Sequence, residues 1–322
     1  MSMKPPIVTA ATLLALFAGE LPAADPQLLN LVMPDAKVLA GVNVDQAKTS
    51  PFGVYVLTQM QSQVQAQQHL QQLTALTGFD PTRDVHELLF AAPATPGNQS
   101  GLALARGAFD AMKIQAAALV AGALTESYQG VTLIEDPKQT HAVAFLDSTL
   151  AVAGDVASVK GAIDRQTLAT PLPAAVITTV NQWSGNEDAW VVLAVPPASL
   201  KPPVNAPNPP NPAVQNALQN IQQAAGGVKF GAQIVLTGQA QTDTPDNATM
   251  LANVGQFLIS LAQMQAQQSN PQLAAALPSM TIAATGNQVN VALSVPEAAA
   301  EQAVKTGPPA TPQTVRRGVR RL

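Results

Sequence analysis

The chain has 322 residues, no cysteine and only 11% charged residues, and its net charge is −4. The absence of cysteine excludes disulfides, thiolate metal sites, cysteine nucleophiles and a lipid-bearing cysteine. Four positive charges lie within the last seven residues, and without them the remainder of the chain carries −8. Such a body excludes a nucleic-acid-binding domain, which needs a basic face. These four residues are Arg316, Arg317, Arg320 and Arg321.

The N-terminal residues have the three parts of a secretory signal peptide. Lys4 gives a positive start, an apolar run extends from Ile7 to Ala18, and the small residues Ala23 and Ala24 precede Asp25. The apolar run is too short to span a bilayer, which takes ~20 residues. We therefore expect residues 1–24 to be cleaved. The mature protein is expected to be periplasmic or secreted, neither a lipoprotein nor anchored by a transmembrane segment.

A first module is predicted at residues 25–168. A strand at 37–44 leads to Ser50-Pro51, a typical helix start, and the apolar stripe of the following helix reaches Leu76 before Gly78 ends it. Another helix is expected after Asp110. The remaining elements are strands at 86–92, 101–109, 131–135, 141–146 and 150–154 and a helix at 156–165.

A second module is predicted at residues 174–306, after a proline-marked linker at 170–173. Residues 196–212 contain eight prolines and are expected to be extended; a spacer is the simpler interpretation, and a functional loop is the alternative. Residues 307–322 are predicted to be a disordered tail rich in proline and arginine. The expected elements are a strand at 189–195, a helix at 213–224, a strand or hairpin across 228–241, a helix at 246–268 and a final hairpin with a helix.

The two modules are predicted to be copies of one unit. Residues 141–164 and 280–303 align without a gap at a shift of 139, so that Val152 meets Val291. The segment DAKVLAGVNV at 35–44 also resembles DAWVVLAVPP at 188–197. Coincidence is the alternative in a chain rich in alanine and valine, but two matches in the same order favour duplication.

The alternation of long helices with antiparallel strands predicts an α+β fold. We expect two tandem, duplicated modules, each an antiparallel sheet with long helices on one face. The order strand–helix–strand–strand–helix–strand is that of a ferredoxin-like unit. The mature chain is long enough for two such modules with separate cores.

Four segments of the first module occur in a recognisable order. They are GFDP at 78–81 with Asp84, GLALARGAFD at 101–110, YQGVTLIED at 128–136 and AFLDSTLAVAGD at 144–155. Together they resemble uncharacterised exported proteins of acidobacteria and related phyla, over roughly residues 35–165. The resemblance implies an α+β scaffold and an extracytoplasmic location, and it transfers no activity and no catalytic residue.

The familiar signatures of an enzyme or a cofactor site are missing from the sequence. His86-Glu87 begins like the helix of a zinc protease, but Phe90 stands where the second histidine is required. His69 and His141 have no ligand spacing, and neither serine-nucleophile nor phosphate-binding motifs occur. We therefore expect no cofactor and no metal, and an enzyme is the less favoured reading.

Paired acidic residues are the remaining candidates for chemistry. Glu135-Asp136 and Glu187-Asp188 could act as general acid and base or hold a divalent cation. Because neighbouring residues at strand ends point apart, solvated turn residues are the favoured interpretation. The acids that flank Arg83 are interpreted as a helix cap with a surface ion pair.

Two helical surfaces suggest contacts with other parts of a protein. The predicted helix at 246–268 has a wide apolar face, for which burial between the modules is favoured and a protein interface is the alternative. The glutamine-rich segments 59–68 and 263–268 are interpreted as uncharged surface, with a partner face as the alternative.

The sequence thus favours an exported, non-catalytic binding or scaffold protein of the bacterial cell envelope. Its partner would be an unknown envelope protein or ligand, and not a nucleic acid. One alternative is a periplasmic hydrolase that uses acids near 80–87. Another is a peripheral membrane protein whose four C-terminal arginines contact anionic lipid, with up to ~1 kcal/mol from each basic residue.

Overall fold

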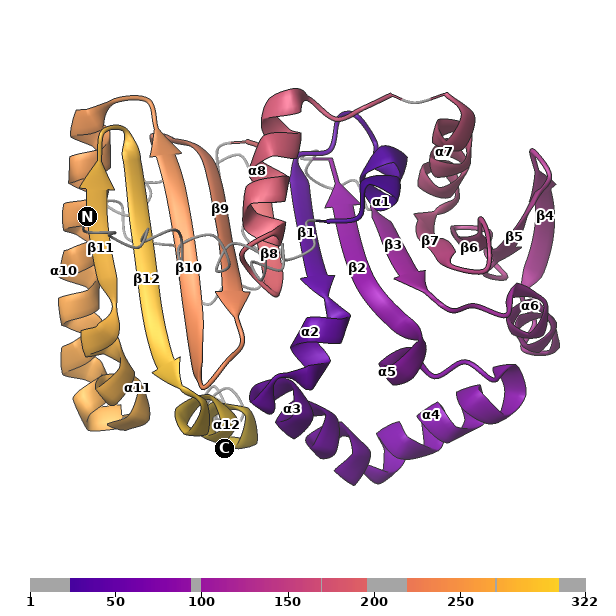
Figure 1. Ribbon diagram of the computed structural model, residues 1–322, viewed down its shortest axis with the longest axis horizontal. Helices are drawn as coiled ribbons and strands as arrows, with labels where there is room; N and C mark the ends of the chain where they lie inside the picture. The colour runs from indigo at the N-terminus through magenta and orange to yellow at the C-terminus, as the bar shows by residue number, and fades with distance from the viewer. Residues whose placement is uncertain (1–23, 94–99, 169, 196–218, 270, 307–322) are drawn as a thin grey trace, which may run out of the picture.

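The computed structural model describes residues 24–93, 100–168, 170–195, 219–269 and 271–306. Within these ranges twelve strands form one antiparallel sheet, with helices packed on it and at the ends of its strands (Figure 1). The predicted α+β class with an antiparallel sheet is confirmed.

The described residues of 24–168 form seven helices and seven strands. They are α1 (Pro26–Leu31), β1 (Val38–Asn43), α2 (Val44–Thr49), α3 (Pro51–Ser62), α4 (Val64–Thr77), α5 (Pro81–Asp84), β2 (Val85–Ala92), β3 (Leu102–Gly107), α6 (Ala111–Val120), β4 (Leu124–Tyr128), β5 (Val131–Glu135), β6 (His141–Phe145), β7 (Leu150–Asp155) and α7 (Val156–Thr167).

The elements of residues 170–306 repeat much of this order. They are α8 (Ala174–Ser184), β8 (Ala189–Leu193), β9 (Ile221–Lys229), β10 (Gln233–Thr242), α10 (Pro245–Ser269), α11 (Pro271–Ala276), a 3₁₀ turn (Leu277–Ser279), β11 (Thr281–Thr285), β12 (Gln288–Pro296) and α12 (Glu297–Thr306).

The strand order of the sheet is β11-β12-β10-β9-β8-β1-β2-β3-β7-β6-β5-β4. Outward from the β8–β1 pair, one side reads β1, β2, β3, β7, β6 and the other reads β8, β9, β10, β12, β11. Both sides therefore use their strands in the same chain order, and the hairpin β4–β5 is an addition to the first. The two segments aligned in the sequence both fold as a hairpin followed by a helix. Common descent and the module boundaries remain predictions.

A single sheet replaces the two separate sheets that the sequence suggests. The first strand of each half supplies the junction, because Val38 to Val42 pair with Leu193 to Ala189 in antiparallel register. An unpaired edge of β1 would expose a row of backbone amides and carbonyls, and β8 satisfies it.

Local signals place the helix boundaries as predicted in several cases. The Ser50 hydroxyl accepts a hydrogen bond from the amide of Gly53 at the start of α3, and Gly78 ends α4 with a left-handed φ of 74°. Asp110 caps α6 through the amide of Lys113. The predicted helix from 51 to 76 is nevertheless two helices, because Gln63 has extended backbone between α3 and α4.

The predicted helix at 213–224 is wrong over residues 221–224. These residues belong to β9, which lies between β8 and β10. Gln219 is helical, and residues 213–218 lie outside the described residues. Pairing on both edges outweighs the helical preference of the sequence IQQAA. The sequence also missed α1, α8 and β4.

One face of the sheet, here called the closed face, carries the main core. Large apolar side chains such as Leu39, Leu89 and Leu104 point to this side and are fully buried. The helices α1, α7 and α8 pack on it, and Val159 of α7 and Val180 of α8 belong to the same core. These helices lie in front of the sheet in Figure 1.

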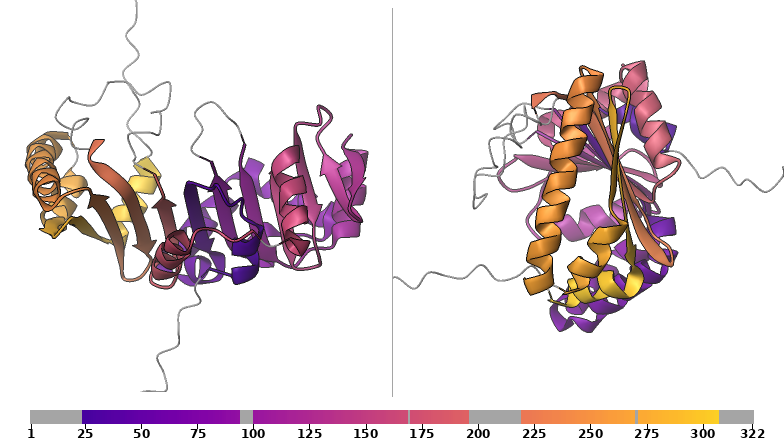
Figure 2. Two further views of the ribbon diagram at one scale, coloured as in Figure 1. Left: turned by 90° about the horizontal axis from the view of Figure 1, so that it is seen from above. Right: turned by 90° about the vertical axis from the view of Figure 1, so that its left-hand side faces the viewer.

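The opposite side, here called the open face, carries α10 at one end. Gly255 of α10 packs on Ile282 of β11, and the right-hand view of Figure 2 shows α10 and α8 on opposite sides of the sheet. Helices therefore lie on both faces, and the prediction of one face is wrong in this respect. Because α10 covers β11 and β12 at the end of the sheet, its predicted burial between the modules is also wrong.

Candidate functional site

The open face is apolar across almost the whole sheet. Strand pairing aligns one continuous row of residues, and all of them are aliphatic, aromatic or glycine. Two further rows beside it share this character, one from Leu293 to Phe145 and one from Ala284 to Ala92. The first row is Ile282, Val291, Gly238, Gly226, Val191, Ala40, Phe90, Ala103, Ala153, Val143 and Ile134.

The middle of the open face is accessible to solvent. Phe90 is 47% exposed, Val191 38% and Val143 36%, whereas their neighbours on the closed face are buried. Among the described residues, the helices that pack over these central strands are α1, α7 and α8, and they lie on the other side. Large accessible apolar surfaces of this kind mark binding sites.

A hollow of about 360 Å³ lies on the open face over β1, β2, β3 and β7. Phe90 forms one wall, and the small residues Ala40, Ala103 and Ala153 form the floor. The floor offers few hydrogen-bonding groups, because backbone amides and carbonyls of these central strands pair with one another. The hollow therefore favours an apolar ligand.

The acidic pair Glu187-Asp188 is buried, so its interpretation as solvated turn residues is wrong. Asp188 is 3% exposed and lies 2.6 Å from the ammonium of Lys229, and its carboxylate also accepts the amide of Phe230. Glu187 accepts the hydroxyl of Thr237 at 2.6 Å. Lys229 is the last residue of β9, which pairs with β8, and Thr237 lies on β10, the next strand of the sheet. These contacts hold the start of β8 to β9 and β10.

Glu135 and Asp136 also have separate structural roles. Glu135 is 2% exposed and accepts the side-chain amide of Gln139, which corrects its interpretation as a solvated residue. Asp136 is a turn residue that accepts the amides of Thr140 and His141. The hydrogen bond from the His141 amide is the largest effect that holds the pKa of Asp136 below its usual value.

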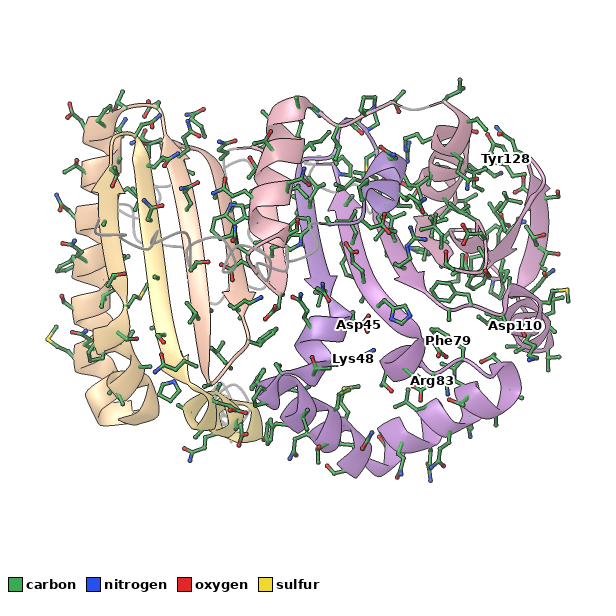
Figure 3. The ribbon with its side chains drawn as sticks, in the orientation of Figure 1. Asp45, Lys48, Phe79, Arg83, Asp110 and Tyr128 are labelled. Atoms are coloured by element: carbon green, nitrogen blue, oxygen red, sulfur yellow. The ribbon has the colours of Figure 1, made fainter. Side chains whose placement is uncertain are left out.

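The acids near Arg83 cap a short helix, as the sequence predicts. Asp80 accepts the amide of Thr82 at the start of α5, and Asp84 forms a pair of 2.6 Å with Arg83. The hydrogen bond from Arg83 is the main cause of the lowered pKa of Asp84. A hollow of about 430 Å³ lies beside them, and Figure 3 shows Phe79, Arg83 and Asp110 around this region. Because its acids are paired, it presents no free carboxylate for hydrolysis.

His86 and Glu87, which follow this segment, point to different partners. The imidazole Nδ1 of His86 lies 3.0 Å from Asp45, which also pairs with Lys48 at 2.6 Å, and Figure 3 shows Asp45 and Lys48 on α2. Glu87 lies on the closed face and accepts the amide of Asp25. Burial raises the pKa of Glu87 above its usual value. In the described residues, histidine and acidic side chains do not gather into a group of three that could hold a metal.

A second apolar surface lies on α10. Phe257 is 66% exposed, Met264 60% and Leu261 39%. These residues belong to the predicted contact face of this helix, so a protein interface there stays a prediction. Among the described residues, none of the helices is both long and apolar enough to span a membrane. The predicted lipid contacts Arg316, Arg317, Arg320 and Arg321 lie outside the described residues.

Sequence reasoning missed the open face although a signal for it was present. The strands VLAGV at 38–42 and LLFAA at 88–92 are apolar at successive positions rather than alternating. Such runs are typical of strands that are buried on both sides. The signal shows that both faces are apolar, and it does not show which of them the chain's own helices cover.

Comparisons with known proteins give information on the fold. The chain matches no family model, and no curated protein matches it in sequence. It is similar to TP0453 in crystal form III, with a TM-score of 0.54 and 10% identity, over 88% of this chain and 99% of that one. For crystal form I of TP0453 the TM-score is 0.50 and the sequence identity 11%, over 88% of this chain and 98% of that one. The chain therefore shares an α+β architecture with TP0453.

Proposed function

We propose that this protein is an exported, non-catalytic binding protein of the bacterial cell envelope that holds a hydrocarbon chain, such as the acyl chain of a lipid, on the open face. The accessible apolar rows through Phe90 and Val191 carry this proposal. A solvent-exposed sheet face is ordinarily polar, because alternation places charged and amide side chains on the side away from the core. The central strands break this rule over several neighbours, which indicates a ligand rather than water as the covering layer.

The chemistry of the face favours a hydrocarbon chain over an extended peptide. A peptide brings its own amides and carbonyls, and burying them without partners costs free energy. Peptides that bind sheets find these partners at an edge strand, whereas β1, β2 and β3 are paired on both sides. A hydrocarbon chain has no such groups, so the floor of alanine and glycine residues suits it.

Export rests on the signal-peptide pattern of residues 1–24, with a positive start, a short apolar run and a small-residue exit. The absence of cysteine from the sequence suits a protein held together by packing alone. Asp80 is engaged as a helix cap and Asp84 in an ion pair with Arg83, which weighs against the hydrolase alternative at these two acids.

The test compares one substitution at two exposed phenylalanines. Phe90→Glu places a charge on the open face, and Phe257→Glu places the same charge on the exposed side of α10. Binding of a fluorescent long-chain fatty acid to the purified protein is measured by titration. We expect Phe90→Glu to weaken binding by about tenfold or more, because a buried charge is costly, and Phe257→Glu to leave it within about twofold.

Two outcomes would contradict the proposal. Loss of binding only in Phe257→Glu would move the site to α10, and absence of binding by the unchanged protein would remove the hydrocarbon ligand. A circular dichroism spectrum of each variant shows that it is folded. If the open face instead binds an envelope protein, the fatty acid will not bind and a cross-link placed at Val191 will capture that protein.

A further inference from the structure

The segment that follows the predicted cleavage point is part of the core. Leu28 and Val32 are fully buried, Leu31 is 3% exposed, and α1 packs between α7 and β3 on the closed face. Ala24 itself is 4% exposed, and its amide donates to the hydroxyl of Ser184 at 2.9 Å. The last residue of the predicted leader, Ala24, is therefore already buried in the folded protein.

Three charged side chains meet at this point: Glu87, Asp25 and Arg106. Their two negative charges and one positive charge leave a net charge of −1. The amide nitrogen of Asp25 lies 3.1 Å from a carboxylate oxygen of Glu87. The carboxylate of Asp25 lies 2.6 Å from the guanidinium of Arg106, which also donates to Thr149 and Gln27. Two carboxylates thus share one guanidinium, and that guanidinium contacts Asp25 rather than Glu87.

The charged state of Glu87 is the least stabilised of the three. Burial raises its pKa, the hydrogen bond from Asp25 lowers it, the Asp25 carboxylate raises it and Arg106 lowers it. A neutral amide is its donor in the chain that still carries residue 24. A buried carboxylate is stabilised far better by a cation at the same distance.

We infer that the leader is removed at the Ala24–Asp25 bond and that the new α-ammonium of Asp25 then binds the Glu87 carboxylate, which makes the mature N-terminus a structural part of the fold. This inference rests on the proposed export. Hydrolysis breaks the bond between the Ala24 carbonyl carbon and the Asp25 nitrogen, and one water gives its hydroxide to the carbon and its proton to the nitrogen. The new Ala24 carboxylic acid releases a proton and the Asp25 amine takes one up, which leaves a carboxylate and an ammonium. The atom that now lies 3.1 Å from Glu87 becomes a cation without any movement of the chain. The cluster then has two positive and two negative charges.

Cleavage one residue earlier fits the structure less well. It would leave the ammonium on Ala24, where the partner in the structure is the neutral hydroxyl of the buried Ser184. A buried ammonium that faces a hydroxyl is poorly compensated, whereas one that faces a carboxylate is paired. The charges therefore select Asp25 as the first residue.

The test separates the charge of the N-terminus from its length. The chain beginning at Asp25 is prepared with a free amine and, by semisynthesis, with an acetyl group that occupies the place of the Ala24 carbonyl. Each form is made with Glu87 and with Glu87→Gln, and unfolding in urea is measured at neutral pH. We expect the free amine to raise the folding equilibrium constant by about tenfold over the acetylated form when Glu87 is present, and to give no advantage in Glu87→Gln.

The pH dependence has a definite sign. Pairing with Glu87 raises the pKa of the α-ammonium, so the advantage is complete below the ordinary value of about 7.7–8.0 and is lost as the pH rises through the higher folded value. The charged groups around the Asp25 nitrogen are Glu87 on β2, Arg106 on β3 and the carboxylate of Asp25 itself at the N-cap of α1, and Ser184 of α8 contacts the preceding amide of Ala24. Asp147 lies near Arg106, and its pKa lies below the usual value.

An equal advantage of the free amine in Glu87 and Glu87→Gln chains would overturn the ion pair. Sequencing the N-terminus of protein from the native host shows whether the leader is removed and at which bond. A first residue of Asp25 supports the inference, and another cleaved terminus overturns it while export stands. An intact Met1 would overturn export as well.

Discussion

The two faces of the central strands are similar in hydropathy and opposite in environment. Leu39, Leu89 and Leu104 on the closed face are completely buried, whereas Ala40 and Ala103, next to them in the sequence, are only partly buried on the open face. On β3 and β7 the difference lies in side-chain size rather than polarity. Leu104 and Val152 face the protein's own helices, whereas Ala103 and Ala153 face outward beside Phe90. The small residues of these two strands leave room on the open face for another molecule.

The largest expected contrast is between two neighbouring residues of β2. Leu89→Ala removes a fully buried side chain from the closed face and should lower the free energy of unfolding by about 2–5 kcal/mol. Phe90→Ala removes a side chain that is 47% exposed and should cost less than about 1 kcal/mol. Urea unfolding of both proteins measures the difference. Equal costs would show that the open face is covered within the chain itself.

Two glycines provide the next contrast. A Cβ at Gly41 would lie 2.5 Å from the indole ring of Trp190, so Gly41→Ala should cost about 1–3 kcal/mol. At Gly238, in the first open-face row, the nearest atom to such a Cβ is 3.8 Å away, so Gly238→Ala should be neutral or stabilise by about 0.4–1 kcal/mol. Thermal unfolding with tryptophan fluorescence reports both, and a destabilised Gly238→Ala would contradict the contrast.

The carboxylate of Glu87 on the closed face is expected to have a smaller, pH-dependent effect on the free energy of unfolding. In the chain that retains Ala24, burial raises the pKa of Glu87, so the folded state holds the proton more tightly than the unfolded state. The stability that this residue contributes therefore falls as the pH rises above about 4.3. Glu87→Gln should be more stable relative to the unchanged chain at pH 7 than at pH 4.

The comparison with Glu87→Gln is needed because other acids respond in the opposite direction. Lys160 holds the pKa of Glu126 below its usual value, and backbone hydrogen bonds do so for Asp136. Their stabilising effect is lost as the pH falls. A stability difference between the two proteins that does not vary with pH would contradict the assignment to Glu87.

The smallest effect on stability is expected from filling the hollow. Ala103→Val adds two methyl groups where the open face has free space, and the free energy of unfolding should change by no more than about 0.5 kcal/mol. Binding of the fluorescent fatty acid should nevertheless weaken. Unchanged binding in a folded Ala103→Val protein would move the ligand away from this hollow.

Much of the fold could be predicted because its signals are local. Ser50-Pro51, Gly78 and Asp110 mark helix ends through caps that need only neighbouring residues. The strands predicted at 131–135 and 150–154 from their apolar pattern match β5 and β7. β9 was missed because its alanine and glutamine residues favour a helix, and only pairing with β8 and β10 makes a strand of them.

The candidate site was harder to predict because its properties depend on distant segments. Glu187 and Asp188 look like turn residues until Thr237 and Lys229 are placed beside them, 50 and 41 residues away. The same limit applies to the open face, because apolar strands alone do not reveal where the helices pack. Glu87 could be singled out in the sequence, but its contact with Asp25 requires the position of α1.

The pairing of β1 with β8 has a consequence for the order in which the protein is completed. The chain is synthesised from its N-terminus, so residues 38–43 are made long before residues 189–193. During this interval one edge of β1 has no native partner and is open to pairing with a second newly made copy. The arrival of β8 closes this edge, so the second half of the chain protects the first half from such pairing.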